Sequence, residues 1–196
     1  MPIAEMMEKA VQLSAGCPSG CIVEFGVYRG DALLAFRDLA KKYLPPNTEI
    51  YGFDSFAGMP KTAVPLTRAL TRDWAEGAFG DTNLKTVRRR VPSARLVKGV
   101  FSWHSSLLPF GIEKVRLAHV DADIYEGYRD ALRLLTPCVQ LGSVLLFDEG
   151  QCPDNPEYIS VRDHGERAIR EWQNSTGIKL EVIESQWTQV LTQIVA

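Results

Sequence analysis

Residues 115–150 read VRLAHVDADIYEGYRDALRLLTPCVQLGSVLLFDEG, and two apolar runs in this stretch end abruptly at acidic residues. The first run ends at Asp121, and the second ends at Asp148 and Glu149. Short apolar runs bounded by acids are typical of buried parallel strands. In open α/β sheets, ligands bind at the carboxyl ends of such strands. The stretch therefore predicts a strand–helix–strand unit whose acidic residues line a binding crevice.

Asp121, Asp148 and Glu149 form a candidate metal site. Asp121 and Asp148 are 148−121=27 residues apart, which is enough for one helix and a return strand, so both should lie at one sheet edge on neighbouring strands. Converging carboxylates repel one another unless a cation lies between them, and Mg²⁺ is a hard cation that prefers oxygen ligands. Alternatively, the acids cap the intervening helix and pair with its arginines, which explains Asp123 but not the Asp148-Glu149 pair.

A glycine-containing turn, VEFGVYRG at residues 23–30, follows the first expected strand. Gly26 and Gly30 allow a sharp strand-to-helix turn and a close approach of the backbone to a ligand. The spacing is E-x-G-x-x-x-G, which differs from the G-x-G-x-x-G of nicotinamide-binding dehydrogenases. A tight turn whose glycines serve geometry alone is the alternative interpretation.

Asp54 ends the second expected strand, 54−30=24 residues beyond Gly30. An acid at this place can accept both hydroxyls of a ribose, although aspartate is also common in turns after strands. Together with the glycine turn, Asp54 indicates adenosine without phosphates. Asp123 is then expected to meet the adenine edge or to brace the site. Phe101 or Trp103 is expected either to stack on adenine or to pack in the core.

The alternation of helix and strand signals predicts one α/β domain over residues 1–196. Helices are expected at about 3–15 (in a short N-terminal segment, 1–20), 31–43, 81–91, 126–135 and 164–174. Strands are expected at 21–25, 49–53, 94–98, 115–120 and 143–147, with an antiparallel hairpin formed by 180–185 and 188–196 at the sheet edge. Residues 55–80 show no clean periodicity, and so long an irregular stretch predicts a lid or substrate loop.

The composition excludes several classes of partner. A net charge of −2 over 196 residues gives no sign of the positively charged surface that nucleic-acid binding requires. No stretch approaches the ~20 apolar residues of a membrane span, and the N-terminus lacks the apolar core of a signal peptide. These features predict a cytoplasmic protein that does not bind membranes, and its 4 cysteines suit reduced thiols. The modest size and short lid favour a homodimer.

These motifs resemble the macrocin O-methyltransferase family, the TylF/MycF-type enzymes that methylate sugar hydroxyls on macrolide antibiotics. The resemblance covers roughly residues 21–172, and it is carried by VEFGVYRG, YGFDSFAGMP, KGVF, HVDADIYEGYRDAL, VLLFDEG and GERAIREW. It implies a Rossmann-like class I methyltransferase fold, with a mostly parallel seven-stranded sheet, an antiparallel edge strand and helices on both faces. Two features depart from the family: Asp148-Glu149 replaces a pair of aspartates, and the portion before the first strand is short.

The resemblance also implies S-adenosylmethionine (SAM) and Mg²⁺ as cofactors. Its metal ligands would fall on Asp121, Asp148 and Glu149. The predicted cofactor contacts are Glu24, Gly26, Tyr28, Gly30, Asp54, Ser55, Gly99, Phe101 and Asp123.

We therefore expect transfer of the SAM methyl group to a hydroxyl of a small molecule, either a sugar or another vicinal diol. Mg²⁺ would lower the pKa of the attacking hydroxyl, and Asp121 would act as both metal ligand and base. Two alternatives stay open at this point. One is a metal-independent methyltransferase, and the other is a SAM-binding scaffold or regulatory protein that has lost catalysis.

Overall fold

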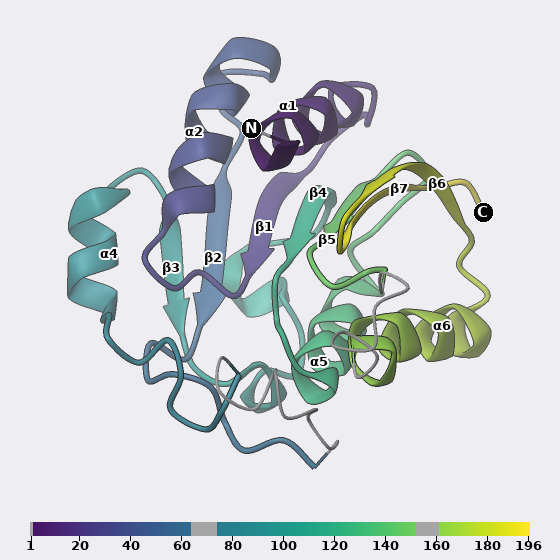
Figure 1. Cartoon of the computed structure of the whole chain (residues 1–196). Helices are drawn as coiled ribbons and strands as arrows, with labels where there is room; N and C mark the ends of the chain where they lie inside the picture. The colour runs from purple at the N-terminus through teal and green to yellow at the C-terminus, as the bar shows by residue number, and fades with distance from the viewer. Residues whose placement is uncertain (1, 64–73, 152–160) are drawn as a thin grey trace.

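The structure is a computed structural model that describes residues 2–63, 74–151 and 161–196 (Figure 1). The helices are α1 (Pro2–Ser14), α2 (Asp31–Tyr43), α4 (Leu84–Arg90), α5 (Tyr125–Leu135) and α6 (Gly165–Thr176), with 3-10 turns η1 (Phe101–Trp103) and η2 (Leu108–Phe110). The strands are β1 (Cys21–Phe25), β2 (Ile50–Asp54), β3 (Arg95–Lys98), β4 (Val115–Val120), β5 (Val144–Phe147), β6 (Leu180–Gln186) and β7 (Gln189–Ile194).

The strands of the described residues form a 7-stranded sheet in the order β3-β2-β1-β4-β5-β7-β6. Neighbouring strands from β3 to β5 pair in parallel, whereas β7 pairs antiparallel with both β5 and β6. The predicted mostly parallel sheet and its C-terminal hairpin are confirmed. Val120 pairs with Phe147, so Asp121 and Asp148 leave neighbouring strands at the same edge, as the sequence predicted.

Helices cover both faces of the sheet, as expected (Figure 1). Successive residues of a strand point to opposite faces, so Ile22 and Leu117 pack with α1, α2 and α4, whereas Val23 and Ala118 pack with α5 and α6. Both faces are apolar because parallel strands buried on two sides need no polar alternation. The carboxyl ends of β1, β2 and β4 are left for the loops that carry the site.

The helix expected at 81–91 starts later than predicted, at Leu84. Asn83 has an extended backbone, and its side chain accepts a hydrogen bond from the backbone N–H of Thr86 at 3.0 Å. Asparagine is a strong N-cap residue because it satisfies an N–H that the first helical turn leaves unpaired.

Among the described residues, no helix is both long enough and apolar enough to cross a membrane.

Candidate functional site

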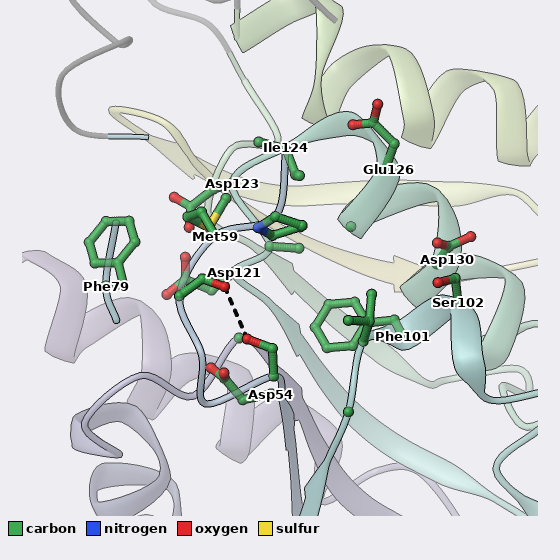
Figure 2. Close-up of a pocket in the computed structure, with 18 of the residues that line it drawn as sticks. Asp54, Met59, Phe79, Phe101, Ser102, Asp121, Asp123, Ile124, Glu126 and Asp130 are labelled. Carbon is green, nitrogen blue, oxygen red and sulfur yellow. Dashed lines mark hydrogen bonds between the residues drawn. The ribbon is translucent and has the colours of Figure 1, made fainter. Parts of the chain in front are cut away.

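A cavity of about 380 Å³ opens at the carboxyl ends of β1, β2 and β4. Figure 2 shows acidic side chains along it, with Phe79 on one side and Phe101 on the other. The residues that line it are Gly26, Tyr28, Asp54, Ser55, Gly58, Met59, Pro60, Lys61, Phe79, Gly99, Val100, Phe101, Ser102, Asp121, Ala122, Asp123, Ile124, Glu126, Gly127, Arg129 and Asp130. The cavity therefore brings together all the predicted cofactor contacts except Glu24 and Gly30.

Gly26 lets the ends of β1 and β4 approach closely. Its φ is +90°, and a Cβ built on it would lie 1.7 Å from the carbonyl oxygen of Asp121. The backbone N–H of Asp121 donates to the carbonyl of Phe25 at 2.9 Å, which holds the two strand ends together. Gly30 has a different role, because it begins α2 at φ +80° and packs against Val87 of α4.

Asp54 organises the loops on both sides of its strand. Its Oδ2 accepts hydrogen bonds from the backbone N–H groups of Val27 at 2.8 Å and Tyr28 at 2.9 Å. Its Oδ1 accepts from the N–H of Phe56 at 2.6 Å. Since a carboxylate offers about four acceptor sites, these three bonds leave one for a ligand. Asp54 is thus well placed to bind a ribose hydroxyl, and it also fixes the turn that carries Gly26.

Glu24 lies in the interior on the α2 side of the sheet. Its Oε1 is 2.9 Å from Nδ1 of His119, and both side chains are buried. Burial raises the pKa of the Glu24 carboxyl. Glu24 Oε2 and His119 Nε2 have no hydrogen-bond partner among the described residues. Because Glu24 does not line the cavity, its direct contact with a cofactor stays a prediction.

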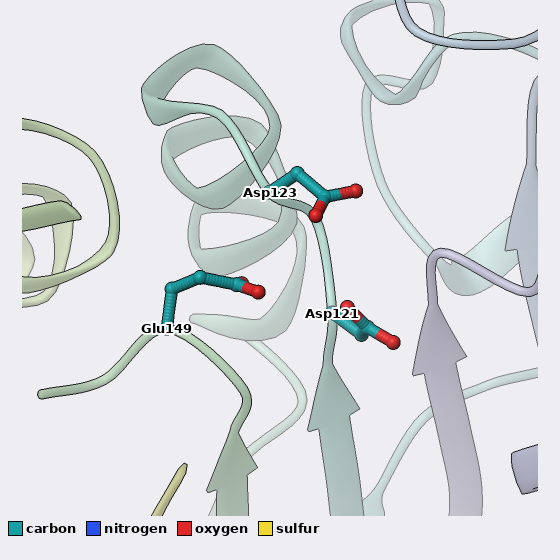
Figure 3. Close-up of side chains that lie close together, drawn as sticks. All are labelled: Asp121, Asp123 and Glu149. Carbon is teal, nitrogen blue, oxygen red and sulfur yellow. The ribbon is translucent and has the colours of Figure 1, made fainter. Parts of the chain in front are cut away.

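Three carboxylates gather at the edge of the cavity where β4 and β5 end. Asp121, Asp123 and Glu149 each place one oxygen within 4.8 Å of the others, and Figure 3 shows them converging. Burial raises the pKa of Asp121 and Glu149 well above the usual range, and the charge of Asp148 adds to both shifts. Burial likewise raises the pKa of Asp123 to about 7. The crowded acids therefore resist ionising together in the absence of a positive charge.

The predicted metal set and this cluster share two of three residues. Asp121 and Glu149 belong to both, whereas the Oδ1 of Asp148 accepts a hydrogen bond from the side-chain amide of Gln189 on β7. Asp123 takes the third place in the cluster, with a positive φ of 57° that aspartate tolerates better than most residues. This geometry does not include Asp148 in the cluster, so its role as a metal ligand stays a prediction.

Tyr128 holds Glu149 in position, a contact that was not predicted from the sequence. The Tyr128 hydroxyl lies 2.8 Å from Glu149 Oε2 and 3.0 Å from the carbonyl oxygen of Val120, and it can donate its one proton to either. It also accepts from the backbone N–H of Glu149 at 2.8 Å. Tyr128 is fully buried on α5. The longer glutamate stem, which departs from the aspartate of the family pattern, is therefore anchored toward Asp121.

The cluster fits one small divalent cation. Two oxygens on opposite sides of Mg²⁺ lie about 4.2 Å apart, because each Mg–O bond is about 2.1 Å long. The oxygens of Asp121, Asp123 and Glu149 lie within 4.8 Å of one another, so small side-chain movements would bring them into range. All three are hard carboxylate ligands, the type that Mg²⁺ prefers.

Two segments of the expected lid form the cavity wall nearest Met59. The backbone N–H of Met59 donates to the carbonyl of Ala78 at 2.8 Å, and the N–H of Gly77 donates to the carbonyl of Met59 at 2.9 Å. Residues 64–73 of the predicted lid lie outside the described residues. The described parts of the lid are thus joined to each other beside the cavity.

Side chains from the body of the domain hold these segments in place. Glu126 of α5 accepts hydrogen bonds from the hydroxyl of Thr62 and the backbone N–H of Ala63, each at 2.8 Å. Phe79 packs edge-on against Tyr28, with ring centroids 5.2 Å apart. The described parts of this region, residues 55–63 and 74–80, therefore contribute a wall of the cavity, as a substrate loop would, while movement of the predicted lid stays a prediction.

A family model described as macrocin-O-methyltransferase (TylF) matches residues 3–193. The chain belongs to this family. The match confirms the resemblance suggested by the motifs. TylF-family proteins are O-methyltransferases, a class of enzyme that uses SAM.

Two relatives of this TylF-family chain are O-methyltransferases of Micromonospora griseorubida and Streptomyces niveus. The chain is 26% identical over 181 residues to mycinamicin III 3''-O-methyltransferase of Micromonospora griseorubida. The aligned region covers 88% of this chain and 67% of the relative. The chain is 28% identical over 145 residues to demethyldecarbamoylnovobiocin O-methyltransferase of Streptomyces niveus. The aligned region covers 68% of this chain and 54% of the relative. The chain thus spans between about half and two thirds of the length of these relatives.

Solved structures confirm the fold of this TylF-family chain. The O-methyltransferase NovP superposes with a TM-score of 0.77 at 22% identity, covering 99% of this chain and 80% of NovP. The calicheamicin methyltransferase CalS11 gives a TM-score of 0.73 at 23% identity, covering 98% of this chain and 79% of CalS11. The predicted Rossmann-like methyltransferase fold is therefore confirmed.

Proposed function

We propose that this chain is a SAM-dependent O-methyltransferase that requires a divalent cation and acts on a hydroxyl of a small molecule. One observation carries the proposal. The ribose-binding candidate Asp54, the glycine turn at Gly26 and two acids of the carboxylate cluster, Asp121 and Asp123, line one cavity. A methyl donor and a chelated acceptor would then meet in the same space, and holding two reactants in the right geometry lowers the barrier to reaction between them.

The cofactor end of the cavity is formed by backbone and one carboxylate. Asp54 would accept a ribose hydroxyl, while Gly26 lets the methionine part approach the backbone between β1 and β4. Phe101 would provide an apolar wall for the adenine. Family membership supports SAM as the ligand of this end of the cavity.

The acceptor end is formed by the carboxylate cluster. Bound SAM would supply the methyl group, and a bound divalent cation would favour the ionised form of the acceptor hydroxyl. Asp121, Asp123 and Glu149 would hold the cation, with Asp148 as the alternative third ligand. Asp121 lines the cavity, which supports the proposal that it also receives the proton of the hydroxyl.

The acceptor that we propose is a sugar or another vicinal diol on a natural product. The relatives named above act, by their names, on mycinamicin III and on demethyldecarbamoylnovobiocin. A further relative from Streptomyces olivaceus, 29% identical over 146 residues, is a 4'-O-methyltransferase of a rhamnosyl tetracenomycin. Two adjacent oxygens suit a cation that has open positions beside three carboxylates. The homodimer and the cytoplasmic location stay predictions.

Removing the cation or Glu149 should stop methyl transfer but preserve cofactor binding. We expect a chelator to lower turnover of a diol acceptor at least about 100-fold, because the cation contributes several kcal/mol to such reactions, and Mg²⁺ to restore it. Glu149→Gln should show a similar loss, while S-adenosylhomocysteine binds with affinity within about threefold of the parent. Calorimetry and a methyl-transfer assay on a panel of diols measure the two effects.

The matched variant Asp148→Asn distinguishes the two possible ligand sets. Full turnover in Asp148→Asn would favour Asp123 as the third ligand, and a loss equal to that of Glu149→Gln would favour Asp148. Undiminished turnover in the chelator would instead support a metal-independent methyltransferase. Cofactor binding without transfer to any acceptor would support the scaffold alternative.

Tyr128→Phe should weaken cation binding without unfolding the protein. The substitution keeps the buried ring and removes the hydroxyl, which bonds the Glu149 side chain, the Glu149 backbone N–H and the Val120 carbonyl. Residues that orient metal ligands typically contribute 10- to 100-fold to metal affinity, so we expect a loss of about 10-fold in a Mn²⁺ titration. Tyr125→Phe on the same helix, whose hydroxyl bonds to Glu171 instead, is the control and should retain the parent affinity. Equal affinities in both variants would contradict the anchoring role.

A further inference from the structure

His164, directly before α6, is a buried imidazole that the proposed chemistry does not use. Its side chain is fully buried, and its Nδ1 accepts a hydrogen bond from the backbone N–H of Tyr125 at 2.8 Å. The ring of Trp74 packs edge-on against it, with centroids 6.1 Å apart. Since Nδ1 is the acceptor, the proton of the neutral ring lies on Nε2. The imidazole is therefore held by groups that are far from it in sequence.

This hydrogen bond caps the start of α5 from another helix. The first N–H groups of a helix have no partner within the helix, and a polar side chain at the N-cap usually accepts from one of them. The N-cap residue of α5 is Ile124, whose side chain makes no such bond. His164 instead accepts from Tyr125, the first residue of the helix. The start of α5 thus depends on an acceptor supplied from the beginning of α6.

The capped helix start follows directly on a strained turn that carries Asp123. The backbone N–H of Ile124 donates to the carbonyl of Ala122 at 2.6 Å, and Asp123 between them has a φ of 57°. A hydrogen bond across three residues with a positive φ at the centre is typical of a strained γ-turn. Strained backbone persists only where its surroundings hold it. Figure 3 shows Asp123 on this turn, between β4 and α5, and the bond at Tyr125 holds the end of the turn.

The same end of α6 also contacts the other side of the carboxylate cluster. A Cβ built on Gly165 would lie 2.0 Å from the carbonyl oxygen of Glu149, so the two backbones pass in direct contact. The short segment His164-Gly165 therefore meets the Glu149 backbone on one side and the residue that follows the Asp123 turn on the other. It links the parts of the chain that carry two of the three cluster acids.

We propose that His164 is a positioning residue for the cation, because its bond to Tyr125 holds Asp123 toward the other acids of the cluster. The inference rests on the proposed function, since it assigns a part in holding the cation that this function requires. Without an acceptor at Nδ1, the Tyr125 N–H would lose its partner and the strained turn would lose the bond at its end. Residues that orient metal ligands typically contribute 10- to 100-fold to metal affinity.

A calorimetric Mn²⁺ titration of the full chain tests this role without an activity assay. His164→Leu removes the acceptor and should lower the Mn²⁺ affinity about 10-fold. His164→Asn should stay within about threefold of the parent, because its side-chain oxygen lies near the place of Nδ1 and can accept the same N–H. His164→Gln, whose amide lies one bond farther out, should lose as much affinity as His164→Leu. Equal losses in the Asn and Leu variants would show that the hydrogen bond has no role and would overturn the proposal.

Thr136→Val is the matched control, because it also removes a side-chain hydrogen bond between α5 and α6. Thr136 lies at the opposite end of α5, where its hydroxyl accepts from the indole N–H of Trp172 on α6 at 2.8 Å. This variant should lower the free energy of unfolding but keep the Mn²⁺ affinity of the parent, and denaturant unfolding measures the first effect. Equal losses of affinity in Thr136→Val and His164→Leu would indicate a general loosening of the helix pair, which would overturn the proposal.

A double-mutant cycle tests whether His164 acts through Asp123. Asp123→Asn should itself weaken Mn²⁺ binding, and adding His164→Leu should weaken it by less than about threefold further, because the positioned ligand is already lost. Equal losses from His164→Leu in the two backgrounds would overturn the proposal. Parent affinity in Asp123→Asn would also overturn it, while leaving the proposed function with Asp148 as the third ligand. Failure of the parent to bind Mn²⁺ would reject the cation in the proposed function together with this inference.

Discussion

Asp54→Ala should reduce the affinity for S-adenosylhomocysteine at least about 100-fold. The carboxylate has one acceptor site for a ribose hydroxyl beside the three backbone N–H groups that it already binds. A hydrogen bond to a charged group contributes about 1.5–3 kcal/mol, and the loss of order in the turn at Val27 and Tyr28 adds to this. Calorimetric titration of the parent and the variant measures the change.

A cofactor analogue distinguishes the ribose contact from the support of the turn. Removing the 2'-hydroxyl from S-adenosylhomocysteine, or in a second analogue the 3'-hydroxyl, should weaken binding to the parent protein by about 10-fold for whichever hydroxyl Asp54 accepts. Neither removal should weaken binding to Asp54→Ala further, because the acceptor is already gone. Equal losses in both proteins would show that Asp54 acts on the loops alone and would refute its ribose role.

The sequence predicted the sheet and the place of the site because both follow from local patterns. Apolar runs set the strands, and the acids at the ends of β4 and β5 could only emerge at the same edge, since parallel strands joined by a helix must align there. The strand period of two also determines the face on which Glu24 lies. It shares that face with Ile22 and α2, which accounts for its contact with His119 in the interior.

The direction of each acidic side chain could not be predicted in the same way. Asp148 bonds to Gln189 because the C-terminal hairpin places β7 beside β5, a pairing formed by residues about 40 positions away in sequence. Glu149 reaches the cluster because Tyr128 on α5, 21 residues away in sequence, supplies a hydroxyl. The place of Asp130 in the cavity wall was not predicted, because nothing in its local sequence distinguishes it from a solvated helix residue. Such contacts depend on tertiary packing and not on spacing along the chain.

Gly26→Ala should destabilise the protein and abolish cofactor binding. The new Cβ would lie 1.7 Å from a backbone oxygen of Asp121, and a backbone atom cannot move aside as the end of a side chain can. Left-handed backbone strain costs about 1–2 kcal/mol and overpacking about 1–3 kcal/mol, so we expect a loss of roughly 2–5 kcal/mol in the free energy of unfolding. Denaturant unfolding and calorimetry with S-adenosylhomocysteine measure the two effects.

Gly177→Ala provides the matched control, because it isolates the cost of the backbone angle. Gly177 ends α6 with a φ of +74°, close to the +90° of Gly26, but a Cβ there would meet nothing within 4 Å. This variant should lose only about 1–2 kcal/mol from the strained backbone and should bind the cofactor normally. If both variants lost the same stability and both bound S-adenosylhomocysteine, the contact between Gly26 and Asp121 would have no special role. A loss of binding confined to Gly26→Ala would show that the close approach of β1 and β4 shapes the cofactor site.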